Sequence, residues 1–289
     1  MEIMVVLLAM GSAALHPLKE VFIKHNAYPE GLCLAFMSIW TLIAGIHAWV
    51  LGLDFMSVIP VWYLVIISSM AIFFYHFFMI VALSDGDVSV YYPIARSYPL
   101  MIVAIGMLLF GHQYSVSVLG GIALVVIGAF FLQYHDENKL VQNKRALSMA
   151  FLAMTCSAVY SLADAAAMQD VEPVIFFFWD SLLIVPMAVL LFSLTRPRSR
   201  SVTEHLFGGW KITPVGYILA GVTSYLSYIF ILFAYQAGGD VAAVSSIRQA
   251  SVPFSIILSF FLLKELRFRR QMLWSLILVA GIITIILEK

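Results

Sequence analysis

The sequence is poor in charge. Of its 289 residues only 11% are Asp, Glu, Lys or Arg, whereas 63% are hydrophobic. A soluble domain carries about 25% charged and about 45–50% apolar residues. Acidic and basic residues balance at 16 each, so there is no basic excess for binding nucleic acid. We therefore expect a membrane protein without a nucleic-acid partner.

Cysteine and catalytic motifs are equally scarce. Cys33 and Cys156 are the only cysteines, too few and too far apart for a disulfide framework or a metal site. There is no GxSxG, HExxH or P-loop motif. The histidines of the apolar segments stand alone rather than in the close pairs of membrane di-iron enzymes: His16, His47, His76 and His112. We expect no enzyme activity, metal or cofactor, and without an ATP site any transport is passive or gradient-driven.

Long apolar segments are what the sequence has in abundance. A bilayer core of about 30 Å requires about 20 apolar residues per helix. Ten segments meet this need, near 3–24, 30–52, 60–83, 88–110, 115–134, 146–169, 173–193, 213–236, 241–263 and 269–287. Backbone groups in lipid must be satisfied within the segment, and alternating strand patterns are absent. The expected fold class is an all-α membrane protein with ten transmembrane helices. Since Glu2 precedes the first segment and no positive stretch does, we expect a retained helix rather than a signal peptide.

The two halves of the chain resemble each other. FYHFFMIVALSDGDV at 74–88 aligns with SYIFILFAYQAGGDV at 227–241, and earlier in each half Glu20 aligns with Asp164. We expect two five-helix repeats, 1–134 and 146–289, joined by a loop at 135–145. Because five is odd, the second repeat begins on the opposite side of the membrane, an arrangement common in secondary transporters. Chance similarity between apolar segments is the alternative.

Basic residues are concentrated in the loops of one side. The loops that share a side with both termini contain a single Lys or Arg, Lys289. The other side contains twelve: Lys24, Lys139, Lys144, Arg145, Arg196, Arg198, Arg200, Lys211, Lys264, Arg267, Arg269 and Arg270. The positive-inside rule assigns this second side to the cytoplasm. We expect a multi-pass protein of a bacterial inner (plasma) membrane with both termini outside.

Two apolar segments contain an arginine next to helix-breaking residues. The stretch SVYYPIARSYPL at 89–100 holds Arg96 close to Pro99, and SSIRQASVPF in the ninth segment holds Arg248 and Gln249. An arginine at bilayer depth costs roughly 2.5–3.5 kcal/mol on insertion scales and normally faces a wet cavity or the protein interior. Interrupted helices at matching positions indicate a transport site. We expect these three polar residues to contact substrate; a packing ion pair and a gate are the alternatives.

Further candidates are weaker. Aromatic and histidine side chains that could line a cavity, or simply pack, are Tyr92, His16, Tyr75, Tyr228 and Trp40. Intramembrane acids often serve in proton relays, so the coupling or gating candidates are Glu20, Asp164 and Asp180. Static ion pairs are the alternative for these acids.

The motifs YYPIARSYP and SIRQASVPFSIILSFFLLKE, within ten helices and an inverted repeat, resemble the EamA type of the drug/metabolite transporter superfamily. The resemblance covers nearly the whole chain. It implies a central cavity between the halves and alternating access for small metabolites. Family members usually end the fourth and ninth helices with a glutamate, which Glu265 retains and the stretch around His112 lacks. Members are also usually drawn with cytoplasmic termini, opposite to the charge count.

We therefore expect a secondary-active transporter of a small polar metabolite, such as an amino acid, an organic acid or a phosphonate-like anion. Arg96 and Arg248 favour a carboxylate or a phosphate-like group on that substrate. The expected partners are this small molecule, a coupled proton or other ion, and membrane lipid, in a monomer or homodimer. The alternatives are a lipid-linked carrier or flippase and a non-transporting scaffold or receptor, although a scaffold gains nothing from buried charges.

Overall fold

The fold is helical, as expected. A computed structural model describes residues 1–23, 28–85, 88–133, 143–195, 199–254 and 268–288, and within these ranges it contains no strand. Six helical stretches are long and apolar enough to cross a membrane: Pro29–Val50, Phe55–Ala82, Tyr91–Phe110, Lys144–Ala167, Pro173–Thr195 and Pro214–Gln236. Three shorter apolar helical stretches accompany them, Ile3–Leu18, Val116–Leu132 and Leu273–Leu287.

The helix boundaries lie within a few residues of the predicted segments. In chain order the elements are α1 (Ile3–Ile23), α2 (Pro29–Val50), η1 (Phe55–Val61), α3 (Trp62–Asp85), α4 (Val88–Arg96), α5 (Tyr98–Phe110), α6 (Val116–Gln133), α7 (Lys144–Ala167), α8 (Pro173–Thr195), α9 (Val202–Phe207), η2 (Gly208–Lys211), α10 (Pro214–Gln236), α11 (Val241–Ile247), η3 (Arg248–Ala250) and α13 (Phe268–Leu287). The predicted ninth segment lies outside the described residues beyond Phe254.

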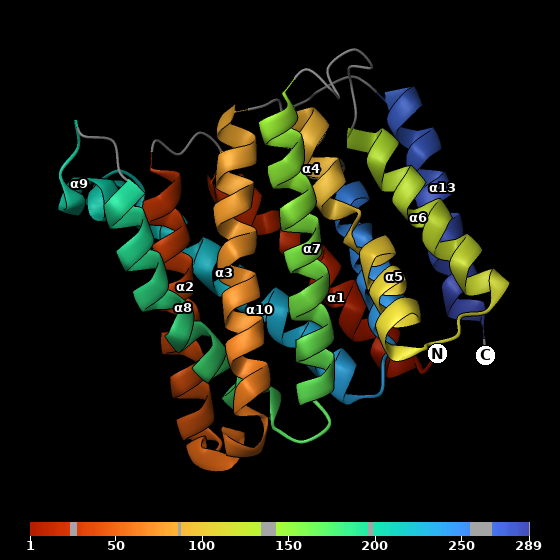
Figure 1. The fold of residues 1–289 in the computed structure, drawn as a ribbon, viewed down its shortest axis with the longest axis horizontal. Helices are drawn as coiled ribbons and strands as arrows, with labels where there is room; N and C mark the ends of the chain where they lie inside the picture. The colour runs from red at the N-terminus through yellow and green to blue at the C-terminus, as the bar shows by residue number, and fades with distance from the viewer. Residues whose placement is uncertain (24–27, 86–87, 134–142, 196–198, 255–267, 289) are drawn as a thin grey trace.

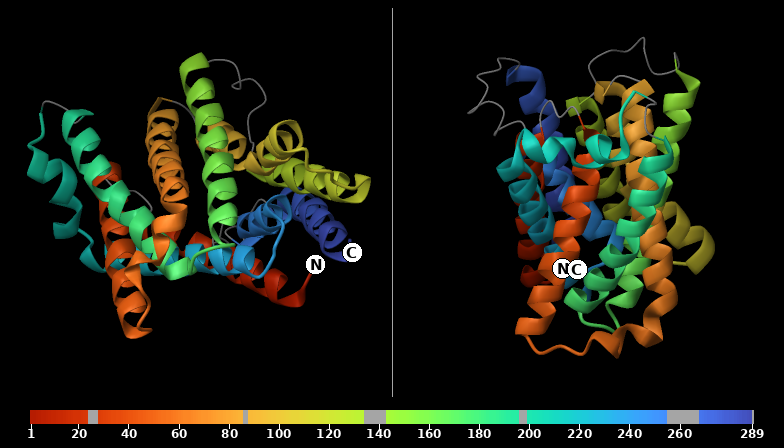
Figure 2. Two further views of the ribbon diagram at one scale, coloured as in Figure 1. Left: turned by 60° about the horizontal axis from the view of Figure 1, so that its bottom comes forward. Right: turned by 90° about the vertical axis from the view of Figure 1, so that its left-hand side faces the viewer.

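The long helices run between two edges of the molecule (Figure 1). The N and C ends lie side by side at the lower edge, together with the turns between α2 and η1 and between α7 and α8 (Figures 1 and 2). The short helix α9 and the first turns of α4, α7 and α13 lie at the upper edge. Many large apolar side chains face outward, among them Leu7, Trp49, Leu108 and Leu190. Such a surface suits a lipid environment.

The principal helix pairs join one half of the chain to the other. Helix α1 packs along α10, α3 along α7, α2 against α8, and α6 against α13. Small residues permit the last contact, since a Cβ on Gly281 would lie 2.6 Å from the carbonyl oxygen of Gly121, and one on Gly128 would lie 2.7 Å from the backbone nitrogen of Leu278. Close backbone approach at glycine is typical of membrane helix packing. Gly121 and Gly128 therefore pack within the chain.

Two helices are broken at corresponding places. Helix α4 ends at Arg96, and α5 begins at Tyr98 with a proline in its first turn. Because proline has no N–H, Pro99 cannot donate to the carbonyl of Ala95. The N–H of Leu100 donates to the carbonyl of Ser97 at 3.1 Å rather than to that of Arg96, and the carbonyl of Arg96 accepts a hydrogen bond from Gln249 Nε2 at 2.9 Å. Helix α11 likewise ends at Ile247, and the tighter turn η3 contains Arg248. Each break thus places an arginine at a helix end.

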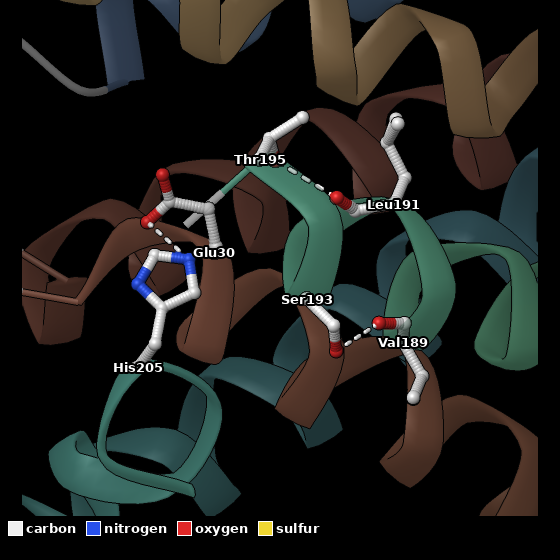
Figure 3. A network of polar contacts seen from close by, with 6 residues as sticks. All are labelled: Glu30, Val189, Leu191, Ser193, Thr195 and His205. Carbon is white, nitrogen blue, oxygen red and sulfur yellow. Dashed lines mark hydrogen bonds and ion pairs between the residues drawn. The ribbon is translucent and has the colours of Figure 1, made fainter. Parts of the chain in front are cut away.

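The basic stretch between α8 and α10 is expected to be a loop, but part of it, Val202–Phe207, forms α9. Ser201 caps this helix by accepting a hydrogen bond from the backbone N–H of Glu204 at 3.1 Å, a common N-terminal signal. A Cβ on Gly31 would lie 2.7 Å from the carbonyl oxygen of Leu206, so glycine lets α9 approach α2. His205 Nε2 lies 3.9 Å from Glu30 Oε2 across this contact (Figure 3).

The last turns of α8 lie beside this contact in Figure 3. The hydroxyl of Ser193 donates to the carbonyl of Val189 at 2.5 Å, and that of Thr195 to the carbonyl of Leu191 at 2.9 Å. Such bonds to the preceding turn satisfy the donor of a hydroxyl group within an apolar helix.

Candidate functional site

A cavity lies among the helices of both halves. It encloses about 610 Å³, including the space at its opening, and is lined by His16, Trp40, Ile72, Tyr75, His76, Ala95, Arg96, Tyr98, Ser157, Tyr160, Ser224, Ser227, Tyr228 and Arg248. Six of these residues are the predicted Arg96, Arg248, His16, Tyr75, Tyr228 and Trp40. Residues as far apart in the sequence as His16 and Arg248 therefore share one wall.

Arg96 is held by uncharged groups. Its side chain is only 6% exposed. One guanidinium nitrogen donates to the hydroxyl of Ser251, and the other terminal nitrogen lies 3.4 Å from His16 Nε2. Its Nε has no hydrogen-bond partner among the described residues. The predicted Tyr92 lies beside it, with its ring centroid 5.9 Å from the guanidinium carbon.

Arg248 is surrounded by tyrosines. It is 8% exposed, and its guanidinium carbon lies 5.8 Å from the ring centroid of Tyr228. The hydroxyls of Tyr98, Tyr160, Tyr228 and Tyr235 lie within electrostatic range of its charge. In the part of the chain that the structure describes, neither arginine is within ion-pair distance of a carboxylate. The cavity thus presents two cations, neither of which forms an ion pair with a described acid.

Gln249 does not line the cavity. Its side chain is fully buried and donates to the backbone of Arg96, while its Oε1 has no partner among the described residues. This bond joins the break after α4 to the break after α11. Gln249 therefore supports the backbone of Arg96 and does not lie at the cavity surface.

Aromatic rings form one side of the cavity. Tyr228 stacks on Phe177 with ring centroids 4.8 Å apart, and on Trp40 at 6.1 Å. The indole nitrogen of Trp40 donates to the hydroxyl of Ser224 at 2.8 Å. These contacts hold Trp40 and Tyr228 in fixed orientations, with apolar surface and a few polar groups directed at the cavity.

Two predicted acids lie behind this aromatic side. Asp164 accepts hydrogen bonds from the hydroxyl of Ser68 at 2.6 Å and from the hydroxyl of Tyr228. Asp180 is fully buried, and neither of its carboxylate oxygens has a hydrogen-bond partner among the residues with described side chains. The side chain of the third predicted acid, Glu20, lies outside the described residues.

Residues 144–287 match the model of the EamA-like transporter family. The chain belongs to the EamA-like transporter family. One crystal structure, described only as that of a protein, covers 97% of this chain and 96% of its own length with a TM-score of 0.78 and 16% sequence identity. At that identity the likeness shows the fold alone. No curated protein sequence matches the chain.

The family determines the broad class of the protein. EamA proteins belong to the drug/metabolite transporter superfamily and are membrane transporters rather than enzymes. This EamA-like protein is therefore a multi-pass membrane transporter, as its apolar helices also indicate.

Several cavity residues of this EamA-like transporter were not predicted from its sequence: His76, Tyr98, Ser157, Tyr160, Ser224 and Ser227. A signal was available for some of them. Ser224, Ser227 and Tyr228 are spaced three and four residues apart and therefore share one face of α10, as Ser157 and Tyr160 do on α7. A polar stripe on an otherwise apolar membrane helix indicates the face that is turned away from lipid.

Proposed function

We propose that this transporter carries a small anion, such as an amino acid, an organic acid or a phosphonate, by alternating access through the central cavity. The observation that carries the proposal is the pair of buried arginines, Arg96 and Arg248, that have no carboxylate partner in the described part of the chain. A buried charge without a partner is costly. A bound carboxylate or phosphate-like group would supply both arginines with a negative charge and hydrogen-bond acceptors, because the planar guanidinium binds such groups with two parallel hydrogen bonds.

The helix pairing supports ten spans built as two inverted repeats, 1–134 and 146–289. Under the symmetry that would exchange the two repeats, α1 corresponds to α7 and α10 to α3. The contact of α1 with α10 then corresponds to that of α7 with α3, and both contacts are extensive. The pairs α2 with α8 and α6 with α13 exchange into themselves. The two arginines then stand at equivalent helix breaks and approach the cavity from opposite sides. In inverted-repeat transporters, rocking of one repeat against the other opens the site to each side in turn.

We further propose that both termini face away from the cytoplasm of a bacterial cell. The basis is the distribution of Lys and Arg, since the loops on the side of the termini contain only Lys289.

Ligand binding can be tested by the thermal stability of the detergent-purified protein in the presence of glutamate, lactate or inorganic phosphate, with putrescine and glucose for comparison. Binding to the folded state stabilises it by RT ln(1 + [L]/Kd), about 2.7 kcal/mol at a ligand concentration about 100 times Kd. We expect at least one anion to raise Tm, and Arg96→Gln and Arg248→Gln to abolish the shift. Arg145→Gln, which removes an exposed arginine at the start of α7, is the matched control and should retain it. No shift with any anion, or an equal shift in both cavity variants, would contradict the proposal.

A further inference from the structure

Two carboxylates are enclosed in the transmembrane region next to the cavity. Asp164 on α7 is 1% exposed and Asp180 on α8 is 0% exposed. Ser68 of α3 lies close to both, and its hydroxyl donates to Asp164 Oδ1. The two acids lie within electrostatic range of each other, and both oxygens of Asp180 are without a hydrogen-bond partner among the residues described.

The charges around this pair do not balance. Among the described side chains, the cation that acts on it is Arg248, which lies within electrostatic range of Asp164. One cation can offset one carboxylate. Two like charges in one buried site repel each other, and a proton bound to either member removes that repulsion. Asp180, whose oxygens accept no hydrogen bond from the described residues although Ser68 lies nearby, is the member that lacks compensation.

Tyr228 connects the acid pair with the cavity. Its hydroxyl donates to Asp164 Oδ2, its ring packs beneath the Arg248 guanidinium, and the residue lines the cavity. A proton that arrives from the cavity can bond to the Tyr228 oxygen while the hydroxyl proton already present passes to Asp164. The tyrosine is neutral before and after this transfer, and the acid pair has gained one proton.

We propose that Asp164 and Asp180 form a proton-binding site reached through Tyr228, and that its protonation strengthens anion binding at Arg248, so that proton and anion are carried together. The coupling rests on the proposed anion transport; the proton site itself does not. When both acids are ionised, Asp164 offsets the charge of Arg248. A proton on the pair removes one negative charge and leaves more of the positive field for an anion in the cavity.

The sign of the coupling follows. Anion affinity should increase as pH falls, by at most about tenfold per pH unit for one linked proton. Linkage is reciprocal, so anion binding should in turn take up as much as about one proton from solution.

Other titratable groups face the same region and must be distinguished from the pair. They are His16 beside Arg96, His76 in the cavity wall, Tyr160 on α7, and Tyr225 on α10, which is bonded to His47 at 2.8 Å. A histidine that gained a proton would also favour an anion. The variants distinguish the two cases by their effect on anion binding. Asp→Asn imitates the protonated acid, so it should keep binding tight at every pH. His→Gln imitates the neutral histidine, so it would keep binding weak if that histidine were the proton site.

A metal cation is the competing occupant. Among the described residues no group of three His, Cys, Asp or Glu side chains could hold a metal ion. A sodium ion would need several oxygen ligands, whereas a proton needs a single carboxylate oxygen and one acceptor. The small donor set around Asp180 therefore favours the proton.

The first experiment measures Tm shifts with glutamate and lactate between about pH 5 and about pH 8, the range in which these probes keep one net negative charge. Wild type should bind more tightly at low pH. Asp164→Asn and Asp180→Asn should bind tightly throughout, and His16→Gln and His76→Gln should keep the pH dependence. The inference is overturned if affinity in the wild type does not depend on pH, if a His→Gln variant stays weak at low pH, or if replacing choline by sodium alters affinity and pH does not.

A second experiment needs no anion. Infrared difference spectra of the purified protein near neutral pH should contain the carbonyl band of a protonated carboxyl, and Asp180→Asn should lose or shift that band. If wild type and variant do not differ, the proton site is wrong. If no anion binds at any pH but the band is present, the proposed function fails while the proton site stands. If an anion binds with an affinity independent of pH, the proposed anion binding stands and its coupling to the proton is wrong.

Discussion

The two cavity arginines are held by different kinds of neighbour. Arg96 is bonded to the hydroxyl of Ser251 and lies near the imidazole of His16, whereas Arg248 lies among tyrosine hydroxyls and over the ring of Tyr228. Both arrangements orient a planar guanidinium through uncharged groups in contact with it. Lysine could supply the charge but not the plane of donors or the ring contact.

This difference between Arg and Lys gives a prediction at the scale of single residues. Arg96→Lys and Arg248→Lys should each weaken binding of the anion that stabilises wild type by about tenfold, because one of two parallel charged hydrogen bonds is lost. The dissociation constants can be obtained by titrating the Tm shift. Arg145→Lys serves as the control for charge and size. Unchanged affinity in both cavity variants would mean that the guanidinium groups do not touch the anion.

At the scale of elements, the broken helices and the glycine contacts matter most. The breaks after α4 and α11 are joined by the hydrogen bond from Gln249 to the carbonyl of Arg96. The contact between α6 and α13 depends on glycine, since the two backbones approach so closely that a Cβ at these positions would meet atoms of the other helix.

A prediction about stability follows for these two helices. A Cβ on Gly281 would lie 2.6 Å from the Gly121 carbonyl oxygen and 2.8 Å from the backbone nitrogen of Val125, so Gly281→Ala should destabilise the protein by about 1–3 kcal/mol. Gly120→Ala is the matched control, because a Cβ there meets nothing within 4 Å, and it should change stability by no more than about 0.5 kcal/mol. Thermal unfolding of both variants in one detergent makes the comparison. Equal Tm values for the two variants would show that α6 and α13 can move apart to accommodate the Cβ without loss of stability.

At the scale of the whole molecule, the halves are not separate bodies. Each of the main helix pairs joins the first half to the second, and the cavity takes residues from both. A movement of one half against the other would therefore change the cavity directly. The large apolar side chains on the outside allow the surface to contact lipid over much of its area.

The orientation of the molecule can be tested directly. Alkaline phosphatase folds only outside the cytoplasm, where its disulfides form. A fusion after Lys289 in a bacterial host should therefore be active, because the basic loops retain the other side in the cytoplasm. A fusion within the basic stretch around Arg200 should be inactive. The opposite pattern would reverse the orientation.

Much of this protein was determined by local chemistry and could be predicted from the sequence. Apolar segments of spanning length become helices in lipid wherever they lie in the chain, and Pro99 interrupts its helix because it has no N–H to donate. An arginine next to such a break must find polar surroundings, so the sequence predicts that Arg96 and Arg248 turn away from lipid, and both line the cavity. The short helix α9 was missed, although its Ser201 and Glu204 have the spacing of a capping signal.

Only the tertiary structure decided which faces of the helices meet. Gln249 and Arg248 are neighbours in the sequence, yet one supports Arg96 and the other lines the cavity, because the η3 turn directs them apart. Asp164 and Asp180 come together through Ser68 of α3, which lies about a hundred residues earlier in the chain. Such proximity depends on the rotation and pairing of whole helices. These are determined by the sum of many packing contacts across the molecule, and no local stretch of sequence contains them.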